Sequence, residues 1–505
     1  MSSTPAELPG YYYDAEKKRY FAIEKSHTAP ASAKWSSASV KRRKLESQAA
    51  EEASKEEELI KNSVKRNVLI HDAAASGLLA REMGSPRTAE AGRGRLENGD
   101  MAAAMWARGL TDKGSVAFEI SLNYETHPHM PCFYVSGKEC GTESAIAYSS
   151  FDDELLMGIY IETDENENLK TRSASIRQSG KPHYEMIYCP QMSSIKYHQP
   201  TNKVLLTSKQ YGENRSLCVF TPPMETSPDL GLHWALGEIN SYRNIMNDFS
   251  QNWNWGVNQS TPAPASSNLL CVVGTNKGIQ RIHLNETPSW ITQTATPPNY
   301  GHDARIDYPG RRTYFGPQEI FSQDFQVGNH NILLAGGRQH RLWITDLRAP
   351  AAGWSFVKYG SSIAHVRSIN SHQVLVAGLQ NRMSMYDMRY FRSDKKGPRG
   401  LITSSPLLEF PDYKNESYFQ IGWDVSTELN LVASAQDNGT VKLFSLSSGR
   451  AVRSGKALES LRTGNPVKAM MFQTLPGEKL PSLYVAEGLF LKKFGFAPGN
   501  DSDDE

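Results

Sequence analysis

One unit recurs through most of this 505-residue chain: an apolar strand, a small residue, a polar turn and a second strand. The second strand ends near an Asp or a residue that replaces it. Clear copies span 268–284, 331–348, 372–389 and 429–449, and weaker copies span 203–220, 482–496 and 150–163. Such a repeat constrains the fold more than composition does, because each copy must bury its apolar faces against its neighbours.

The spacing of the copies favours a ring of blades. Asp346 and Asp387, which end the second strands of two consecutive copies, lie 41 residues apart. A period of about 40–45 residues is typical of a four-stranded blade. Other steps are longer because of insertions at 222–267, 285–317 and 391–416. We therefore predict an all-β chain whose residues 113–497 form a seven-bladed β-propeller, with a sandwich of short strands or another type of propeller as alternatives.

Residues 1–112 are polar and charged, and we interpret them as an N-terminal arm. The arm contains an aromatic motif at 8–21, a helical segment at 45–83 and a flexible linker at 84–112. Residues 498–505 form an acidic tail. The arm is therefore predicted to be helical in part and disordered in part, with the propeller as the main globular body.

The aromatic motif has the pattern of a small hairpin. Two aromatic runs flank a polar turn at 14–17, and we take their side chains as candidate partner-binding residues: Tyr11, Tyr12, Tyr13, Tyr20 and Phe21. An isolated hairpin is only marginally stable in water, so this one should fold on a surface. That surface belongs either to an external partner or to the propeller, whose outer face the motif would complete as an added strand.

Composition and motifs argue against several classes of function. Lys and Arg number 55 against 54 Asp and Glu, so the net charge of +1 gives no general attraction to nucleic acid. The five cysteines form no CxxC pair, which argues against a disulfide framework or a zinc site. No apolar run approaches the roughly 20 residues of a membrane span. We expect a soluble protein of the nucleus or cytoplasm, with the KRRK run at 41–44 as either an import signal or an ordinary basic stretch.

The sequence contains no persuasive catalytic set. The GxSxG, HExxH and GxxxxGK patterns are absent, and the 13 histidines are scattered. We therefore predict a non-catalytic protein with no cofactor and no metal, and keep a propeller hydrolase only as a distant alternative.

Two consecutive copies of the repeat end on the same three-residue pattern. Asp346 and Arg348 bracket one residue, and so do Asp387 and Arg389. Both arginines are predicted to face outward on one end of the ring. Arginine presents five N–H donors in a rigid fork and is enriched among interface hot spots. The alternative is an unrelated Arg in each turn, with the Asp only capping its strand.

These features resemble known proteins. The run AQDNGTVKLFSLSSG at 435–449 resembles a WD repeat with Ser445 where Asp is usual, and Tyr386-Asp387 matches the terminal dipeptide of that repeat. The Asp-x-Arg pair resembles the paired DxR box of the WD-repeat substrate receptors of cullin-four RING ubiquitin ligases. In that family the box docks on the ligase adaptor.

The resemblance carries over residue by residue. It implies that Asp346, Arg348, Asp387 and Arg389 bind the adaptor, although Thr345 replaces the aromatic residue usual before Asp346. The segment 8–21 resembles the opening of one member of the family. In such receptors a helical segment before the propeller also contacts the adaptor, and residues 59–82 are the candidate here, unless that helix is only a solvated arm.

The implied function is that of a substrate receptor, whose second partner is a protein substrate that the sequence does not identify. The alternative function is a WD-repeat scaffold subunit of a nuclear complex in chromatin or RNA processing. Trp253 and Trp255, in the insertion 240–267, are a further candidate recognition patch, or a lid on the core. We expect neither membrane nor direct nucleic-acid binding.

Overall fold

A computed structural model describes the greater part of the chain from Tyr11 to Ala497. The described residues are 11–14, 17–24, 35–37, 39–42, 44–50, 98–118, 130–140, 145–151, 155–161, 163–170, 184–188, 191–208, 217–222, 243–244, 256–283, 288–293, 317–348, 354–393 and 401–497.

The chain divides into two compact units, Met1–Glu97 and Asn98–Glu505. In the first, β1 (Tyr11–Asp14) and β2 (Arg19–Ala22) pair as an antiparallel hairpin, which confirms the hairpin predicted from the aromatic motif. The ring of Phe21 stacks on that of Trp35 with centroids 5.3 Å apart. Residues 44–50 are helical, and the rest of the predicted helical segment, 51–83, lies outside the described residues.

The second unit confirms the predicted propeller, because its described strands form seven sheets of at least four strands. Blade one is β4 (Phe133–Val135), β5 (Ala145–Phe151), β6 (Leu155–Ile161) and β7 (Tyr184–Tyr188). Blade two is β8 (Met192–His198), β9 (Lys203–Ser208), β10 (Leu217–Phe220) and β11 (Arg243–Asn244). Blade three is β12 (Val257–Pro262), β13 (Cys271–Thr275), β14 (Gly278–Ile282) and β15 (Ser289–Gln293).

The remaining blades follow the same order along the chain. Blade four begins with β16 (Ile320–Gln326), β17 (Asn329–Gly337), β18 (Arg341–Asp346) and β19 (Ser355–Lys358). Blade five is β20 (Ile363–Ser368), β21 (Gln373–Gly378), β22 (Met383–Asp387) and β25 (Leu408–Glu409). Blade six is β26 (Trp423–Ser426), β27 (Leu431–Ala435), β28 (Val441–Ser445) and β29 (Ala451–Val452). Blade seven contains β30 (Met470–Gln473), β31 (Ser482–Glu487) and β32 (Phe490–Phe496).

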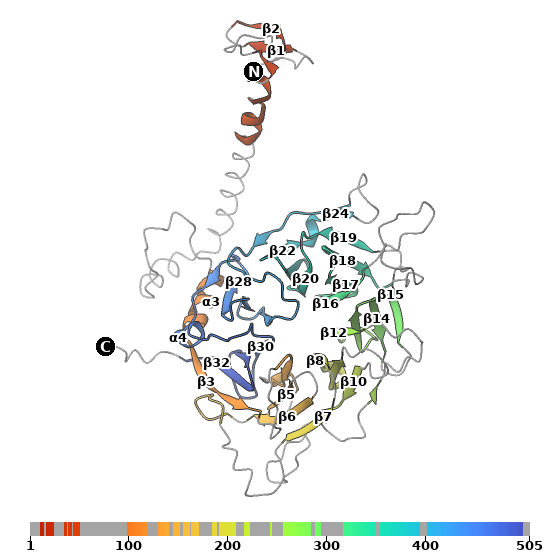
Figure 1. The fold of residues 1–505 in the computed structure, drawn as a ribbon, viewed down its shortest axis with the longest axis vertical. Helices are drawn as coiled ribbons and strands as arrows, with labels where there is room; N and C mark the ends of the chain where they lie inside the picture. Colours follow the sequence, from red (N-terminus) through yellow and green to blue (C-terminus); the bar gives the residue numbers. More distant parts are fainter. Residues whose placement is uncertain are drawn as a thin grey trace, which may run out of the picture. The chain divides into compact units, whose positions relative to one another are not determined.

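The blades stand around a common axis, with the first strand of each blade innermost (Figure 1). Each repeat found in the sequence is the antiparallel pair of the second and third strands of a blade. The weakest copy, 150–163, takes in only the end of β5 together with β6. The sequence pattern therefore located the hairpin of every blade and left the inner and outer strands unassigned.

Each junction between neighbouring blades has its own buried apolar cluster. Leu334, Leu342 and Val357 of blade four, for example, pack with Val374, Val376 and Tyr386 of blade five. The described core contains seven such clusters, one for each junction of the ring. A strand exposes alternate side chains on its two faces, so a blade with apolar residues on both faces needs a neighbour on each side.

The ring closes through a strand from the N-terminal side of the unit. β3 (Leu110–Ala117) pairs antiparallel with β32 and becomes the outer strand of blade seven. Before it, α3 (Asn98–Arg108) packs Ala103, Trp106 and Ala107 against blades six and seven. The prediction of a flexible linker over 84–112 is therefore wrong for residues 98–112. The sequence of α3 is short and Ala-rich, and its apolar face is evident only once blades six and seven are present.

The sheet of blade four is larger than expected, because two strands from the chain of blade five extend it. After blade five's third strand the chain forms β23 (Arg392–Ser393) and β24 (Leu401–Thr403), and β24 pairs parallel with β19 of blade four. The predicted insertion 391–416, which lies between the third and fourth strands of blade five, is thus partly an extension of the sheet of blade four.

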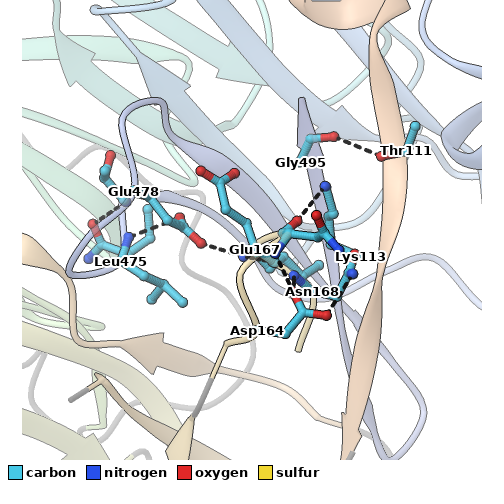
Figure 2. A network of polar contacts seen from close by, with 12 residues as sticks. Thr111, Lys113, Asp164, Glu167, Asn168, Leu475, Glu478 and Gly495 are labelled. Atoms are coloured by element: carbon cyan, nitrogen blue, oxygen red, sulfur yellow. Dashed lines mark hydrogen bonds and ion pairs between the residues drawn. The ribbon is translucent and has the colours of Figure 1, made fainter. Parts of the chain in front are cut away.

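A loop of blade one crosses to blade seven and is held there by two lysines (Figure 2). The Lys113 ammonium donates to the Asn166 carbonyl, 2.8 Å away, and the Leu169 N–H donates to the Lys113 carbonyl. The fully buried Lys493 donates to the Glu167 carbonyl and forms an ion pair with Glu478. These contacts reinforce the junction at which the ring closes.

Candidate functional site

The Asp346-Leu347-Arg348 turn follows β18, the third strand of blade four. The Asp346 carboxylate accepts the Arg348 backbone N–H at 3.0 Å, and it accepts Nε and a terminal nitrogen of the Arg348 guanidinium at 3.0 and 2.6 Å. Leu347 packs onto the apolar cluster between blades three and four. The turn therefore anchors its middle residue in the core while the Arg348 side chain stays 69% exposed.

The Asp387-Met388-Arg389 turn repeats this geometry at the end of β22 in blade five. The Asp387 carboxylate accepts the Arg389 backbone N–H at 3.0 Å and the guanidinium at 3.0 and 2.6 Å. Met388 packs onto the cluster between blades four and five, which also includes Ile344 of β18. Asp387 is buried, whereas the Arg389 side chain is 59% exposed.

The four residues Asp346, Arg348, Asp387 and Arg389 are called the docking rim below. They occupy equivalent positions on consecutive blades, as the sequence predicted. Hydrogen bonding by Arg348 lowers the pKa of the Asp346 carboxyl to about 2, and hydrogen bonding by Arg389 lowers that of Asp387. Both carboxylates are therefore charged at neutral pH, and each holds its arginine in one bidentate geometry.

Apolar side chains lie beside the docking rim. Tyr390 is 64% exposed, and the Arg389 guanidinium lies 6.0 Å from its ring centroid. Val327, 48% exposed, lies in the turn that precedes β17. This turn is at the same end of blade four as Arg348, because the Leu347 N–H donates to the Asn331 carbonyl at the start of β17. Neither Tyr390 nor Val327 was predicted from the sequence, although Tyr390 directly follows the second Asp-x-Arg pattern.

Blade six lacks the Asp-x-Arg pattern, and other residues stabilise the turn after its third strand. Ser445, the last residue of β28, accepts the Ser447 N–H at 3.1 Å through its hydroxyl. The hydroxyl in turn donates to the carboxylate of Asp100 in α3. The helix therefore supplies the carboxylate that the third strand lacks, and no arginine projects from this turn. Asp100 was missed because the sequence assigned it to a linker.

The remaining candidate residues lie elsewhere. Tyr11, Tyr12 and Tyr13 are in β1, and Tyr20 and Phe21 are in β2, with Tyr11 53% and Tyr20 38% exposed. The centroids of the Tyr13 and Tyr20 rings are 4.9 Å apart. Trp253 and Trp255 lie outside the described residues, as does the acidic tail.

The described residues contain no group of three or more His, Cys, Asp and Glu side chains placed to hold a metal ion. Cys132, Cys140, Cys218 and Cys271 are all present as thiols. Among the helices that the structure describes, none has the length and apolarity needed to cross a membrane.

Comparison with known proteins gives one match to a curated sequence. The chain is 41% identical over 190 residues to WD repeat-containing protein 21 of Schizosaccharomyces pombe (strain 972 / ATCC 24843). The match covers 36% of this chain and 40% of the relative's own length. The chain is therefore similar to a WD-repeat protein over part of the length of each. No family model matches the chain.

Two solved structures are similar in outline. The WD40 β-propeller domain of Doa1 has a TM-score of 0.47 and 9% identity and covers 77% of this chain and 98% of its own. The β-propeller domain of Cps50 (Swd1) from Myceliophteria thermophila has a TM-score of 0.47 and 11% identity and covers 77% of this chain and 100% of its own. Values this low carry no weight for function, and the fold rests on the seven sheets themselves.

Proposed function

We propose that this protein is a substrate receptor of a cullin-four RING ubiquitin ligase and that the docking rim binds the ligase adaptor. The observation that supports this most is the repetition of one geometry. Two Asp-x-Arg turns on consecutive blades hold their arginines by the same set of hydrogen bonds. The two turns therefore present two equivalent guanidinium groups on adjacent blades.

The two arginines suit a protein interface. Each bidentate pair uses two of the five N–H donors of the guanidinium, so the others point away from the aspartate. Because its own aspartate already fixes the side chain, each arginine loses little rotamer entropy on binding. The partner then needs backbone carbonyls or carboxylates opposite Arg348 and Arg389, with an apolar contact for the exposed Tyr390.

The connection between blades four and five supports the same function. The segment that follows Tyr390 forms β23 and β24, and β24 pairs with β19 of blade four through Phe356 and Val357. The segment of chain that follows the Arg389 turn is thus paired with blade four, which carries Arg348. Fixing the spacing of two contact points before binding favours recognition of a rigid partner.

The N-terminal unit supplies a second candidate contact. Its hairpin exposes Tyr11 and Tyr20 beside Lys17 and Arg19, and aromatic and basic side chains of this kind are common in interfaces. In the proposed receptor the hairpin or the segment 59–82 adds to adaptor binding, while loops at the end of the ring opposite the docking rim hold a protein substrate. The receptor performs no bond chemistry and raises the concentration of substrate near the transfer site.

The proposal is tested by charge reversal at the docking rim. Arg348→Glu combined with Arg389→Glu should lower adaptor affinity at least about 100-fold, since each is expected to act as a hot spot of about 2 kcal/mol or more. Arg281→Glu is the matched control, because Arg281 is exposed on blade three and donates to Ser289. Affinities are measured with the purified full chain and the adaptor by surface plasmon resonance, and folding is checked by circular dichroism.

Undiminished adaptor binding by the folded double variant would show that the docking rim is not the contact. A native pull-down from nucleus and cytoplasm addresses the function as a whole. Recovery of adaptor and cullin with the wild-type chain, and their loss with the double variant, is expected. Recovery of neither would favour the scaffold of a chromatin or RNA-processing complex.

A further inference from the structure

Charged residues gather around the axis of the ring, away from the docking rim. In blades two, four and five the inner strand starts with a shift in its pairing register, after Met192, Ile320 and Ile363. The residue four positions later in each strand is charged: Lys196, Asp324 and Arg367. Asp424 of blade six completes the group through an ion pair of 2.9 Å with Arg367. These four residues are called the axial belt.

Three members of the axial belt have partners within the protein. Asp324 accepts the N–H of Ser368 on blade five at 2.8 Å, and Asp424 accepts the N–H of Phe472 on blade seven at 2.8 Å. Arg367 pairs with Asp424 and is attracted by Asp324 as well. Each of the two carboxylates therefore bridges two blades and balances the charge of the arginine between them.

Lys196 differs from the other three. It interacts electrostatically with Asp324, Asp424 and Arg367, but its ammonium has no hydrogen-bond acceptor within the described residues. An ammonium group has three N–H donors, so those of Lys196 take their acceptors from solvent or from a bound ion. The side chain is only partly buried, and the Arg367 side chain nearby is 41% exposed, so solvent and small ions reach this level of the ring.

Two more polar atoms on inner strands lack hydrogen-bond partners among the described residues, and one of them belongs to His365, which the charge of Lys196 affects. His365 Nε2 and Trp423 Nε1 are buried without a hydrogen bond among the described residues. Their rings stack with centroids 5.0 Å apart and planes 7° apart. Burial and then the charge of Lys196 lower the pKa of His365 to about 3, so the imidazole is neutral. Lys196, His365 and Trp423 come from three different blades, and His365 links the other two: the charge of Lys196 acts on it and Trp423 stacks on it.

We propose that Lys196 is the centre of a binding site for a carboxylate ion at the axis of the propeller, with the His365–Trp423 pair beside it. A carboxylate offers two acceptor oxygens, one for the ammonium and one for a neighbouring N–H donor. A single negative charge is the best match, because Asp324 and Asp424 would repel a phosphate dianion more strongly. Burial raises the pKa of the Asp324 carboxyl, and the charge of Arg367 opposes that shift.

The carboxylate has two possible sources, a small free acid or the side chain of an acidic residue in a bound protein. The site does not depend on the proposed adaptor docking, which uses other residues at the end of the third strands. Failure of the docking experiment would therefore leave it untouched.

The site is tested with the full-length protein labelled with ¹³C at its histidine rings. Sodium acetate and the blocked tripeptide acetyl-Gly-Glu-Gly-amide are titrated separately at constant ionic strength. The His365 signal, identified with His365→Gln, should shift and saturate with an apparent Kd of about 1–10 mM for at least one probe. Saturation by acetate alone identifies a small acid as the ligand, and saturation by the tripeptide identifies an acidic side chain.

Substitutions separate the site from general effects of salt. Lys196→Met should raise the apparent Kd at least about tenfold, and Lys196→Arg, which keeps the charge, should still bind. Lys442→Met is the matched control, because Lys442 lies on an exposed part of blade six and donates to the Asp412 carbonyl. Thermal unfolding confirms that each variant is folded. No saturable shift with either probe, or equal binding by folded Lys196→Met, would overturn the site and leave only water beside Lys196.

Discussion

At the scale of single residues, one side-chain acceptor shapes the end of the third strand in blades four, five and six. Asp346, Asp387 and Ser445 each accept the backbone N–H two residues later. A carboxylate has acceptor capacity left for an arginine, whereas a hydroxyl that already accepts one bond donates to another group instead. In blades four and five, Asp at this position therefore holds an arginine, whereas Ser445 at the same position in blade six anchors α3.

The ion pair of Asp346 predicts a titration with a definite sign. The pKa of this carboxyl is lowered to about 2 in the folded protein, from about 4 in an unfolded chain. The pair therefore stabilises the folded state above about pH 4, and this contribution is lost as the pH falls through 2. Carboxyl NMR should give a pKa of about 2 for Asp346.

The same titration in Arg348→Gln should show the pKa of Asp346 moving up toward its usual range, since the guanidinium is gone. Arg389→Gln, on the neighbouring blade, serves as the control and should leave Asp346 unchanged. If the pKa of Asp346 is the same with and without Arg348, the bidentate geometry does not exist in solution.

Asp100 carries a prediction about α3. Asp100→Ala leaves the buried Ser445 hydroxyl without its acceptor, and loss of one partner of a buried hydrogen bond costs about 1–3 kcal/mol. Urea unfolding of the full chain measures the change in free energy of unfolding. Met105→Ala, at a 50% exposed position of the same helix, should change it by less than about 0.5 kcal/mol. Equal effects of the two substitutions would mean that Asp100 does not anchor the helix.

At the scale of elements, the strands that recur as a sequence pattern were predicted, and the strands without such a pattern were not. The hairpin of the second and third strands has a strong pattern because its residues are buried on both faces, as in β21 and β27. The outer strands β11, β25 and β29 have only two residues each, too few for any periodicity. Likewise, β24 was hidden because its partner β19 is on another blade.

The docking rim could be predicted for a different reason. Asp346 and Asp387 mark the ends of equivalent strands, so the identity of the residue two positions later could be compared between copies. The axial belt could not be found this way, because the inner strands show no recognisable copy of one another in sequence. Their alignment follows from the shared register shifts, which only the structure provides.

Where the propeller begins can be tested by truncation. Removal of residues 1–97 leaves α3 and β3 in place and should shift the unfolding midpoint by no more than about 2 °C. Removal of residues 1–118 deletes the outer strand of blade seven and also α3, whose Trp106 packs against blades six and seven, so the ring should not close. Differential scanning calorimetry should then show no cooperative transition. A normal transition without residues 98–118 would mean that β3 is not needed for closure.

At the scale of the whole molecule, a closed ring depends on its weakest junction, since each blade contacts only its neighbours. In the described structure, blades one and seven lie far apart in sequence and meet through β3, the cluster around Tyr484 and Leu491, and the loop held by Lys113 and Lys493. The ring is closed by a strand from the other end of the unit. Opening the ring therefore breaks the pairing of β3 with β32 and also exposes the apolar cluster.

Lys493 and Glu478 form the part of this junction that is most sensitive to substitution. Both side chains are buried, at 0% and 2% exposure, so Lys493→Met leaves the Glu478 carboxylate charged and without its cation. Removing one partner of a buried ion pair typically costs about 3–5 kcal/mol. Urea unfolding of Lys493→Met should therefore show a loss of this size, whereas Lys492→Met, which removes a partly exposed ion pair with Glu487, should cost less than about 1 kcal/mol.

A double variant, Lys493→Met with Glu478→Gln, separates the contribution of the ion pair from that of the surrounding packing. Glu478→Gln keeps an oxygen for the Leu475 N–H, so adding it to Lys493→Met removes the unpaired charge without removing that hydrogen bond. The two substitutions should therefore be coupled by about 1–3 kcal/mol, with the double variant more stable than Lys493→Met alone. Strict additivity would show that Lys493 matters through its bond to the Glu167 carbonyl of blade one and not through its ion pair with Glu478.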